Sequence, residues 1–354
     1  MENFKVAQVM KEERQNIADA TLLLQLSKMP EMGNRYSPYQ MGKTIEDLKY
    51  HLQFLESALF GSSPVLFVNY LQWLKELLEN LGVPLRDLRM SVVYLGETLK
   101  LRFPDEYDKG MGGIIEEGIA KLDMDSIPSE TFLKKGLTYS KLAEKYLELL
   151  LRGERFNASE LIQNEVKNGA PIKEIYLQVF QNTQYEIGRL WQIGEISVAQ
   201  EHYCTAASQF VMAQLYPYIF KVANKGETVV ATCVGSELHE IGIRMVTDFL
   251  ELSGFNTYYL GANTPADSII KTLIDQKSNI LAVSVTMTFH IPEVSELIRK
   301  VREAKGCEHV KIMVGGYPFN IDHDLWKTVG ADSFSKDSEA AVLEVIELIK
   351  EAKI

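Results

Sequence analysis

The chain has 354 residues, of which 46% are hydrophobic and 24% charged, a balance typical of a globular protein with two or three domains. Its net charge of −11 disfavours nucleic acid and membrane surfaces as partners, because both are negatively charged. With no apolar signal segment and no run long enough to span a bilayer, we expect a cytoplasmic protein. The cysteines are too few and too scattered for a disulfide framework or a zinc site: Cys204, Cys233 and Cys307.

Residues 1–125 are predicted to form an N-terminal helical domain. Apolar residues recur at spacings of three and four over 44–60, 64–82 and 87–103, as on one face of an amphipathic helix. The stretch PDEYDKGMGG (104–113) is predicted to be a loop, and residues 124–136 a linker.

Residues 137–224 are predicted to form a second helical block. Its first helical stretch ends at Gly153, and glycine commonly terminates helices. About four helices follow one another, the number needed for a small bundle. They are predicted at 141–153, 158–169, 170–194 and 197–220.

Residues 226–354 change to alternating strands and helices. Parallel strands need crossover connections, so this alternation predicts a doubly wound, five-stranded parallel sheet of the Rossmann-like type. The predicted fold class is therefore α/β plus all-α. In such sheets ligands bind beyond the carboxyl ends of the strands, so function is expected in the loops after each strand. The strands are predicted at 228–234, 257–261, 280–285, 311–316 and 332–335.

The loop after the first strand carries Glu237, His239 and Gly242. A neutral imidazole is a good ligand for a transition metal, and a carboxylate on its other nitrogen would fix its tautomer. A glycine would let the backbone approach a bulky ligand closely. From these three residues alone, a surface turn with an incidental histidine is the simpler interpretation.

The wider spacing points to a family. Glu237-x-His239-x-x-Gly242 is followed after forty-one residues by Ser284-Val-Thr286, and after another twenty-eight by Gly315-Gly316. This pattern resembles the D-x-H-x-x-G, S-x-L and GG signature of cobalamin-binding domains in methionine synthase, corrinoid methyl carriers, B12-dependent mutases and B12 light sensors. Glutamate replaces aspartate here, as in some light sensors, and threonine replaces leucine.

That resemblance implies that cobalamin binds base-off, with His239 as the lower axial ligand to cobalt. It also implies that Glu237 bonds to His239 and that Gly242 allows close approach of the coenzyme. The nucleotide tail of the coenzyme would then lie in a slot lined by Ser284, Thr286, Gly315 and Gly316.

Family members also place a four-helix cap over the upper face of the corrin, which residues 137–224 are expected to form. The light-sensor branch carries a W-x9-E-H pattern in this cap, matched here by Trp191, Glu201 and His202. The resemblance implies that Trp191 packs beside a 5′-deoxyadenosyl group, with Glu201 and His202 near its polar atoms. The alternative is a core tryptophan and a solvated helix face. Gln192 stands where some light sensors have a histidine that captures cobalt after photolysis, which leaves the photoproduct open.

The N-terminal domain lacks the basic recognition helix of light-responsive transcription factors. It resembles instead the helical, globin-like domain of photocobilins, which pair B12 with biliverdin. No cysteine precedes Cys204, so biliverdin would be bound there non-covalently or be linked from elsewhere. A helical interaction domain with a buried aromatic core is an equal alternative. Candidate biliverdin contacts are Tyr50, His51, Tyr70, Trp73 and Arg86.

Three further histidines match no ligand spacing, and we expect them to face solvent or the tail slot. They are His290, His309 and His323.

Together these features predict a non-enzymatic light sensor that depends on adenosylcobalamin, with photolysis changing cap packing and assembly. The predicted form is a homo-oligomer, a dimer or tetramer, that signals to an unknown downstream protein. The alternative is a corrinoid methyl carrier of a methyltransferase system, although its usual D-x-H-D-I-G-K-N run is E-x-H-E-I-G-I-R here. A flavodoxin-like interaction module without cofactor is a third interpretation, which the intact His239 disfavours.

Overall fold

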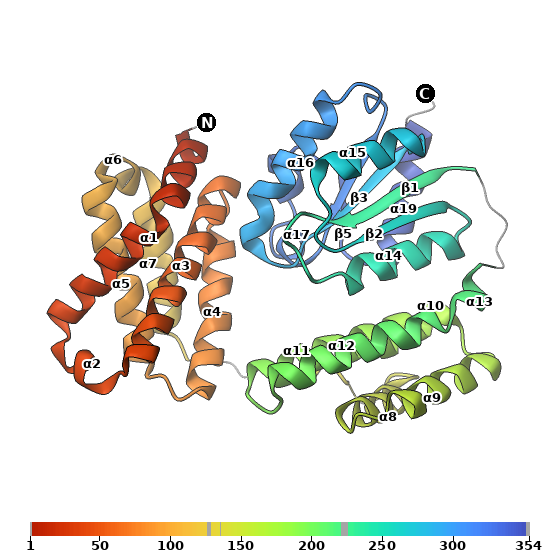
Figure 1. The fold of residues 1–354 in the computed structure, drawn as a ribbon, viewed down its shortest axis with the longest axis horizontal. Coiled ribbons are helices and arrows are strands. Elements are labelled where there is room, and N and C mark those ends of the chain that lie inside the picture. The colour runs from red at the N-terminus through yellow and green to blue at the C-terminus, as the bar shows by residue number, and fades with distance from the viewer. Residues whose placement is uncertain (1, 126–128, 135, 221–225, 352–354) are drawn as a thin grey trace. The chain divides into compact units, whose positions relative to one another are not determined.

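The structure, a computed structural model, describes residues 2–125, 129–134, 136–220 and 226–351. The chain folds as two compact units (Figure 1). The first contains residues 1–126, 228–243 and 258–354, and the second contains residues 127–227 and 244–257.

The N-terminal part of the first unit is helical, as predicted. Helix α3 shows why its boundary is sharp: Ser37 and Gln40 form a capping box, and Pro38 occupies the first helical position. Helix α1 packs against α3 and α5, and α4 packs against α7, so that apolar stripes meet in a common core. The helices are α1 (Glu2–Lys28), α2 (Pro30–Arg35), α3 (Pro38–Gly61), α4 (Pro64–Asn80), α5 (Leu85–Arg102), α6 (Pro104–Glu106) and α7 (Gly112–Leu122).

The prediction of a loop at 104–113 is wrong, because these residues form consecutive helical segments. Helix α6 runs into a π-helical turn, η1 (Tyr107–Met111), and then into α7. Gly110 has φ 148°, which marks a kink between two helical segments. At Gly112 a Cβ atom would lie 2.6 Å from the Tyr107 ring. The glycines therefore serve a kink and a close ring contact inside a helical segment.

The C-terminal part of the first unit contains the predicted five-stranded sheet. Its strand order is β2-β1-β3-β4-β5, and β1, β3, β4 and β5 pair in parallel. At the carboxyl edge of the sheet, Cys233, Ser284, Gly315 and Ser335 are neighbours in register. The strands are β1 (Thr228–Cys233), β2 (Asn256–Gly261), β3 (Ile280–Ser284), β4 (Lys311–Gly315) and β5 (Ser333–Ser335).

Helices connect the strands, and α15 and α16 lie on one side of the sheet (Figure 1). Residues of β1, β3 and β4 whose side chains point to this side, such as Val230, Leu281 and Ile312, are buried in one core with these helices. The connecting elements are α14 (Ile241–Leu252), α15 (Ala266–Asp275), the 3₁₀ turn η3 (Thr288–His290), α16 (Ile291–Glu303), α17 (Tyr317–Ile321), α18 (Leu325–Val329) and α19 (Ser338–Glu351).

The same hydrophobic core continues into the N-terminal helices. Helix α3 packs against η3, α16 and α18, and α4 packs against α17. A Cβ atom at Gly61 of α3 would lie 2.8 Å from the Leu325 side chain, and the Tyr317 hydroxyl donates to Asn69 Oδ1 at 2.7 Å. The N-terminal helices and the sheet therefore form one packed body.

The second unit holds the predicted four-helix block. Helices α8, α9, α11 and α12 pack pairwise around a core that includes Tyr146, Tyr176 and Phe180. Its predicted range, 137–224, ends in residues outside those described. The elements are α8 (Ser140–Leu151), α9 (Arg155–Lys167), α10 (Ile172–Glu174), the π-helical segment η2 (Ile175–Gln181), α11 (Asn182–Gln192), α12 (Val198–Ala213) and α13 (Tyr216–Ile219).

Of the predicted linker, residues 129–134 and 136 belong to this second unit, whereas residues 124 and 125 belong to the first. The backbone N–H of Phe132 donates to Glu186 Oε2 at 2.9 Å. Residues 126–128 and 135 lie outside the described residues.

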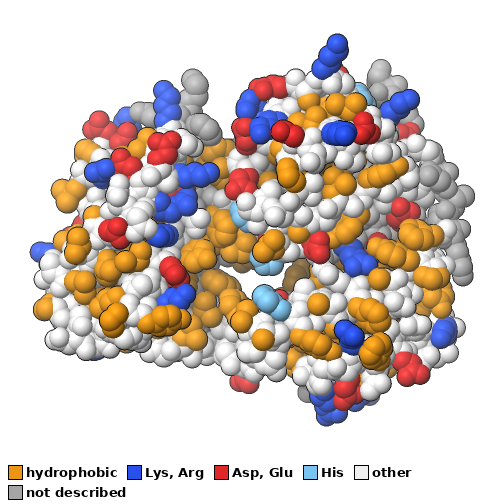
Figure 2. Space-filling view, in the orientation of Figure 1, with side chains coloured by type: hydrophobic (Ala, Val, Ile, Leu, Met, Phe, Trp, Pro, Cys, Tyr) orange, Lys and Arg blue, Asp and Glu red, His pale blue; other side chains and the backbone are white. Residues whose placement is uncertain are grey.

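Acidic and basic side chains lie interspersed on the face that Figure 2 shows. Among the described helices, none is long and apolar enough to cross a membrane.

Candidate functional site

The loop after β1 carries a buried carboxylate, Glu237. Its side chain is fully buried. Its Oε1 accepts hydrogen bonds from the backbone N–H groups of Leu238 and His239, both at 3.0 Å, and from His239 Nδ1 at 2.5 Å. A buried carboxylate needs such partners, because water no longer solvates it.

The other oxygen of Glu237 reaches the loop after β3. Its Oε2 accepts from the backbone N–H groups of Thr286 at 2.9 Å and Met287 at 2.8 Å, and from His290 Nδ1 at 3.2 Å. Burial by itself would raise the pKa of Glu237. The hydrogen bonds from His239, His290 and the Met287 N–H outweigh burial and lower that pKa well below its usual range. Glu237 is therefore a carboxylate at neutral pH.

Glu237 determines how His239 presents its ring. We assign the proton of the neutral ring to Nδ1, because that nitrogen faces the carboxylate. The electron pair then belongs to Nε2, and 57% of the side chain is exposed. This is the arrangement in which a histidine serves as a metal ligand with a carboxylate behind it.

Among the described residues, no cluster of three or more His, Cys, Asp or Glu side chains could hold a metal ion. A metal bound through His239 therefore has to bring most of its ligands with it, as a metal in a macrocycle does.

The three sequence motifs meet at one edge of the sheet, as predicted. Ser284 and Gly315 are neighbours in register at the ends of β3 and β4. A Cβ atom at Gly242 would lie 3.9 Å from Ser284 Oγ. Thr286 joins the same network through its backbone N–H, which donates to Glu237.

The glycine pair has a reason that the sequence did not reveal. Gly316 has φ +105°, and a Cβ atom there would lie 1.9 Å from the carbonyl oxygen of Val285. At Gly315 a Cβ atom would lie 2.9 Å from Ser335 O. The backbones of neighbouring strands therefore require both glycines, whether or not a coenzyme tail also needs the space.

Small side chains surround this edge and suit it to a bulky ligand. Ser284 and Ser335 flank Gly315 in register. Ser338, at the start of α19, has a buried Oγ without a hydrogen-bond partner among the described residues. A buried polar atom without a partner suits a polar ligand that supplies the missing bond.

His290 contradicts its prediction. We expected it in solvent or in the tail slot, but it is only 6% exposed and bonds to Glu237. The η3 turn brings it back beneath the carboxylate. Its place six residues after Ser284, on a loop at the ligand-binding edge, was the available signal, and a search limited to metal-ligand spacing missed it.

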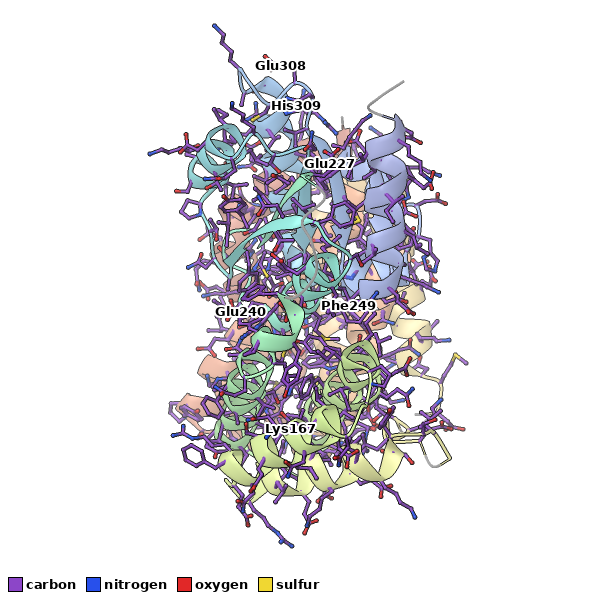
Figure 3. The ribbon with its side chains drawn as sticks, turned by 90° about the vertical axis from the view of Figure 1, so that its right-hand side faces the viewer. Lys167, Glu227, Glu240, Phe249, Glu308 and His309 are labelled. Atoms are coloured by element: carbon purple, nitrogen blue, oxygen red, sulfur yellow. The ribbon has the colours of Figure 1, made fainter. Side chains whose placement is uncertain are left out.

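The other two histidines face solvent, as expected. His309 lies just before β4, at the amino edge of the sheet, away from Glu240, which directly precedes α14 (Figure 3). The ring of His323 lies 5.4 Å from that of Phe334.

Two residues that the sequence did not single out brace the same loop. Glu240 Oε2 accepts from the Tyr259 hydroxyl at 2.9 Å and from the Ala262 N–H at 3.0 Å. Asn263 Oδ1 accepts from the N–H of Ser236, whose φ of 67° is left-handed. The loop after β2 therefore supports the loop that carries His239.

In the second unit, the consecutive residues Glu201 and His202 of α12 have side chains that contact each other. His202 Nδ1 contacts Glu201 Oε2, and Glu201 Oε1 accepts from Thr205 Oγ1 at 3.0 Å. The His202 side chain is 76% exposed. Trp191, near the end of the adjacent helix α11, is half-buried, and Gln192 is buried.

The proposed biliverdin contacts are not all in one place. His51 Nδ1 lies 2.8 Å from the Tyr70 hydroxyl, and both side chains are buried. Burial lowers the pKa of His51 to about 4, so the ring is neutral at physiological pH. Tyr50 is half-exposed, and Trp73 packs at the edge of the core. Arg86 pairs with Glu31 at the surface, at 3.4 Å.

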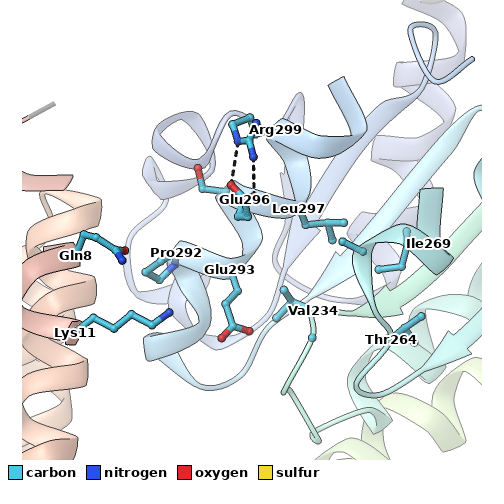
Figure 4. A pocket seen from close by; sticks show the side chains of 13 residues that line it. Gln8, Lys11, Val234, Thr264, Ile269, Pro292, Glu293, Glu296, Leu297 and Arg299 are labelled. Carbon is cyan, nitrogen blue, oxygen red and sulfur yellow. Dashed lines mark hydrogen bonds and ion pairs between the residues drawn. The ribbon is translucent and has the colours of Figure 1, made fainter. Parts of the chain in front are cut away.

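A cleft of about 430 Å³ borders the loop after β1 and the first turn of α16 (Figure 4). Lys11 of α1 and Glu293 of α16 line opposite sides of it, and Val234 and Gly235 after β1 contribute to its wall.

Comparison with known proteins agrees with this geometry. Residues 227–346 match a family model described as B12 binding domain, and residues 142–216 match a second model with the same description. The chain thus contains B12 binding domains, and one of them covers the sheet and the loop that carries His239.

Its relatives are corrinoid proteins. Monomethylamine corrinoid protein 2 of Methanosarcina barkeri is 23% identical over 220 residues, which cover 60% of this chain and 100% of that protein. The trimethylamine corrinoid protein of the same organism is 23% identical over 191 residues, 53% of this chain and 87% of that protein.

A solved structure shows the same fold. The M. barkeri monomethylamine corrinoid protein aligns with a TM-score of 0.54 and 21% identity, over 60% of this chain and 100% of that chain.

Proposed function

We propose that this chain is a corrinoid protein that carries a methyl group on bound cobalamin and presents it to partner methyltransferases. The proposal rests on one observation: a buried carboxylate, Glu237, holds Nδ1 of an exposed imidazole, His239, at the start of the matched B12 binding domain. The methylamine corrinoid proteins among its relatives support the methyl-carrier role. Bound cobalamin supplies a cobalt centre that accepts and releases the methyl group.

In this proposal each residue of the edge has a defined task. His239 would hold the cobalt through Nε2, in place of the coenzyme's own base. Glu237 keeps the proton on Nδ1 and increases the basicity of the ring. Ser284 and the backbones of Gly315 and Gly316 border the nucleotide tail, and the Ser338 hydroxyl gains the partner that it lacks.

A light sensor that depends on adenosylcobalamin is the second candidate. The pairing of Glu201 with His202, on the helix next to that of Trp191, favours it. The N-terminal helices favour it as well, because they lie outside both matched B12 binding regions. In this candidate Trp191, Glu201 and His202 contact the adenosyl group, light changes a homo-oligomeric assembly, and biliverdin is a second chromophore of the N-terminal helices.

One experiment separates the two candidates. The chain is loaded in darkness with methylcobalamin or with adenosylcobalamin, and retention and elution volume are measured before and after green light. A carrier retains methylcobalamin at least as well as adenosylcobalamin, and its elution volume stays the same after illumination. A sensor prefers adenosylcobalamin and changes its elution volume on illumination.

His239→Ala tests the ligand assignment in the same assay. We expect weaker retention and a spectrum shifted toward cobalt ligated by water or by the coenzyme's own base, because the imidazole is removed. Wild-type retention and spectrum in this variant would exclude His239 as the ligand.

A further inference from the structure

The β3–α16 loop, residues 285–290, has contacts on two sides. On one side, Thr286, Met287 and His290 donate to Glu237. On the other side, the Phe289 ring packs against helix α3 of the N-terminal part. It meets Phe54 edge-on, with centroids 5.4 Å apart and planes at 89°, and lies 6.3 Å from the Tyr50 ring.

The α3 side of this contact is firmly held. Phe54 stacks on Tyr70, with centroids 3.7 Å apart and planes at 9°. The Tyr70 hydroxyl in turn bonds to His51, and all three side chains are buried. Closely packed rings of this kind do not shift independently of one another.

The loop side leads directly to Glu237. The rings of Phe289 and His290 are adjacent, with centroids 4.6 Å apart, and His290 bonds to Glu237. Contacts therefore run without interruption from Tyr70 of α4 to the carboxylate that holds His239.

The neighbouring first turn of α16 is less constrained. Pro292 and Glu293 line the cleft of about 430 Å³, which separates this turn from Lys11 of α1 (Figure 4). The cleft limits packing on this side, so the contact of Phe289 with α3 adds a side-chain restraint on the loop to its hydrogen bonds with Glu237.

We infer that helix α3 positions the axial ligand: Phe289, held by Phe54, fixes the β3–α16 loop and, through Glu237, the orientation of His239. Phe289 is a positioning residue, because it reaches the metal only through others. The inference rests on the proposed binding of cobalamin through His239. A ligand or partner that displaces α3 then changes the lower ligation of cobalt, which makes the N-terminal helices a regulatory part of the site.

The test measures axial nitrogen directly. The full-length chain, labelled with nitrogen-15 at histidine, is loaded with cobalamin and reduced to the Co(II) form. In the electron paramagnetic resonance spectrum, coupling to nitrogen-15 gives the fraction of cobalt with an imidazole ligand from the chain, and coupling to ordinary nitrogen gives the fraction with the coenzyme's own base. Phe289→Ala is expected to lower the ratio of imidazole-ligated to unligated cobalt by about two- to tenfold, the range for one aromatic pair. Phe289→Tyr, which keeps the ring, is expected to restore it.

Leu325→Ala is the matched control. Leu325 is buried and lies against Gly61, the last residue of the same helix α3 and seven positions after Phe54. It is expected to lower stability without changing axial nitrogen. Tyr50→Ala covers the case in which Phe289→Ala does not fold, because Tyr50 is 48% exposed and contacts the same ring. A smaller loss in the same direction is expected.

The outcomes separate the inference from the proposed function. If the wild-type spectrum lacks coupling to histidine nitrogen-15, or keeps it in His239→Ala, the proposed function fails. If the wild type shows coupling to histidine nitrogen-15 that His239→Ala removes, while Phe289→Ala and Tyr50→Ala match the wild type, the positioning role alone is overturned. A loss equal to that of Leu325→Ala also overturns it.

Discussion

At the scale of single residues, the site depends on a charge placed where water cannot reach it. Glu237 is tolerated there because six donors surround its two oxygens. The donors come from two loops, so the same carboxylate that orients His239 also fastens the loop after β1 to the loop after β3. Removing the charge of Glu237 therefore affects both the orientation of His239 and the contact between these two loops.

Glu237→Gln should therefore weaken cobalamin binding by about 10- to 100-fold, the usual effect of losing the partner behind a metal-bound histidine. The amide keeps one acceptor but places donors against the N–H groups of Thr286 and Met287 or against His239. Equilibrium dialysis with methylcobalamin measures the change. Glu308→Gln, at the opposite edge of the sheet (Figure 3), should bind as the wild type does. Equal affinity in both variants would contradict the role of Glu237.

His51 gives a prediction about pH. Its pKa falls from an ordinary 6.5 to about 4 on burial, so the unfolded chain takes up its proton first as pH decreases. The stability that neutral His51 contributes is complete above pH 6.5 and is lost as pH falls toward 4. Between about pH 7.5 and pH 5 the loss is roughly 2 kcal/mol.

Urea unfolding of wild type and of His51→Gln at these two pH values isolates this contribution. The glutamine does not titrate but still offers Tyr70 a polar partner. The wild type should lose more of its free energy of unfolding than the variant does. Parallel losses in the two proteins would show that His51 does not titrate as described.

At the scale of elements, the strand ends are packed so closely that two backbones nearly touch. Gly316 lies at the end of β4, where the chain turns into α17 with φ +105° beside Val285 O. This turn aligns β4 with β3 and so places Ser284 and Gly315 side by side. The edge of the sheet depends on a residue without a side chain.

Gly316→Ala should destabilise the protein by about 2 kcal/mol or more, because a left-handed backbone and a close contact add their costs. Gly113→Ala is the matched control: it lies in α7, with no atom within 4 Å of the added Cβ. It should stabilise by about 0.5–1 kcal/mol through helix propensity. Chemical denaturation measures both, and similar effects at the two positions would refute the packing argument.

At the scale of the whole molecule, two units have separate cores, and the sheet shares one of them with the N-terminal helices. This sharing is what gives a 125-residue helical segment access to the site. The match with the monomethylamine corrinoid protein covers all of that protein but only 60% of this chain. The remaining residues of this chain have no counterpart in that relative.

Calorimetry should show more than one unfolding transition, because the two units are compact by themselves. Hydroxocobalamin at 100 times its Kd should stabilise the unit that contains His239 by about 2.7 kcal/mol and raise that transition. In His239→Ala the shift should be much reduced. A single transition, or an equal shift in the variant, would contradict this division of the molecule.

The sequence by itself determined most of the elements, apart from the helical backbone at 104–113, and the edge of the sheet where the three motifs meet. Helical periodicity, strand alternation and the spacing from Glu237 to Gly316 depend on residues near in the chain or on a regular parallel sheet, whose strand ends necessarily meet at one edge. Only the tertiary structure decided that His290 supports Glu237, that Val285 makes Gly316 necessary, and that Phe289 joins α3 to the site. Each of these depends on contacts between distant segments, and local pattern carries no information about which distant side chain fills a given space.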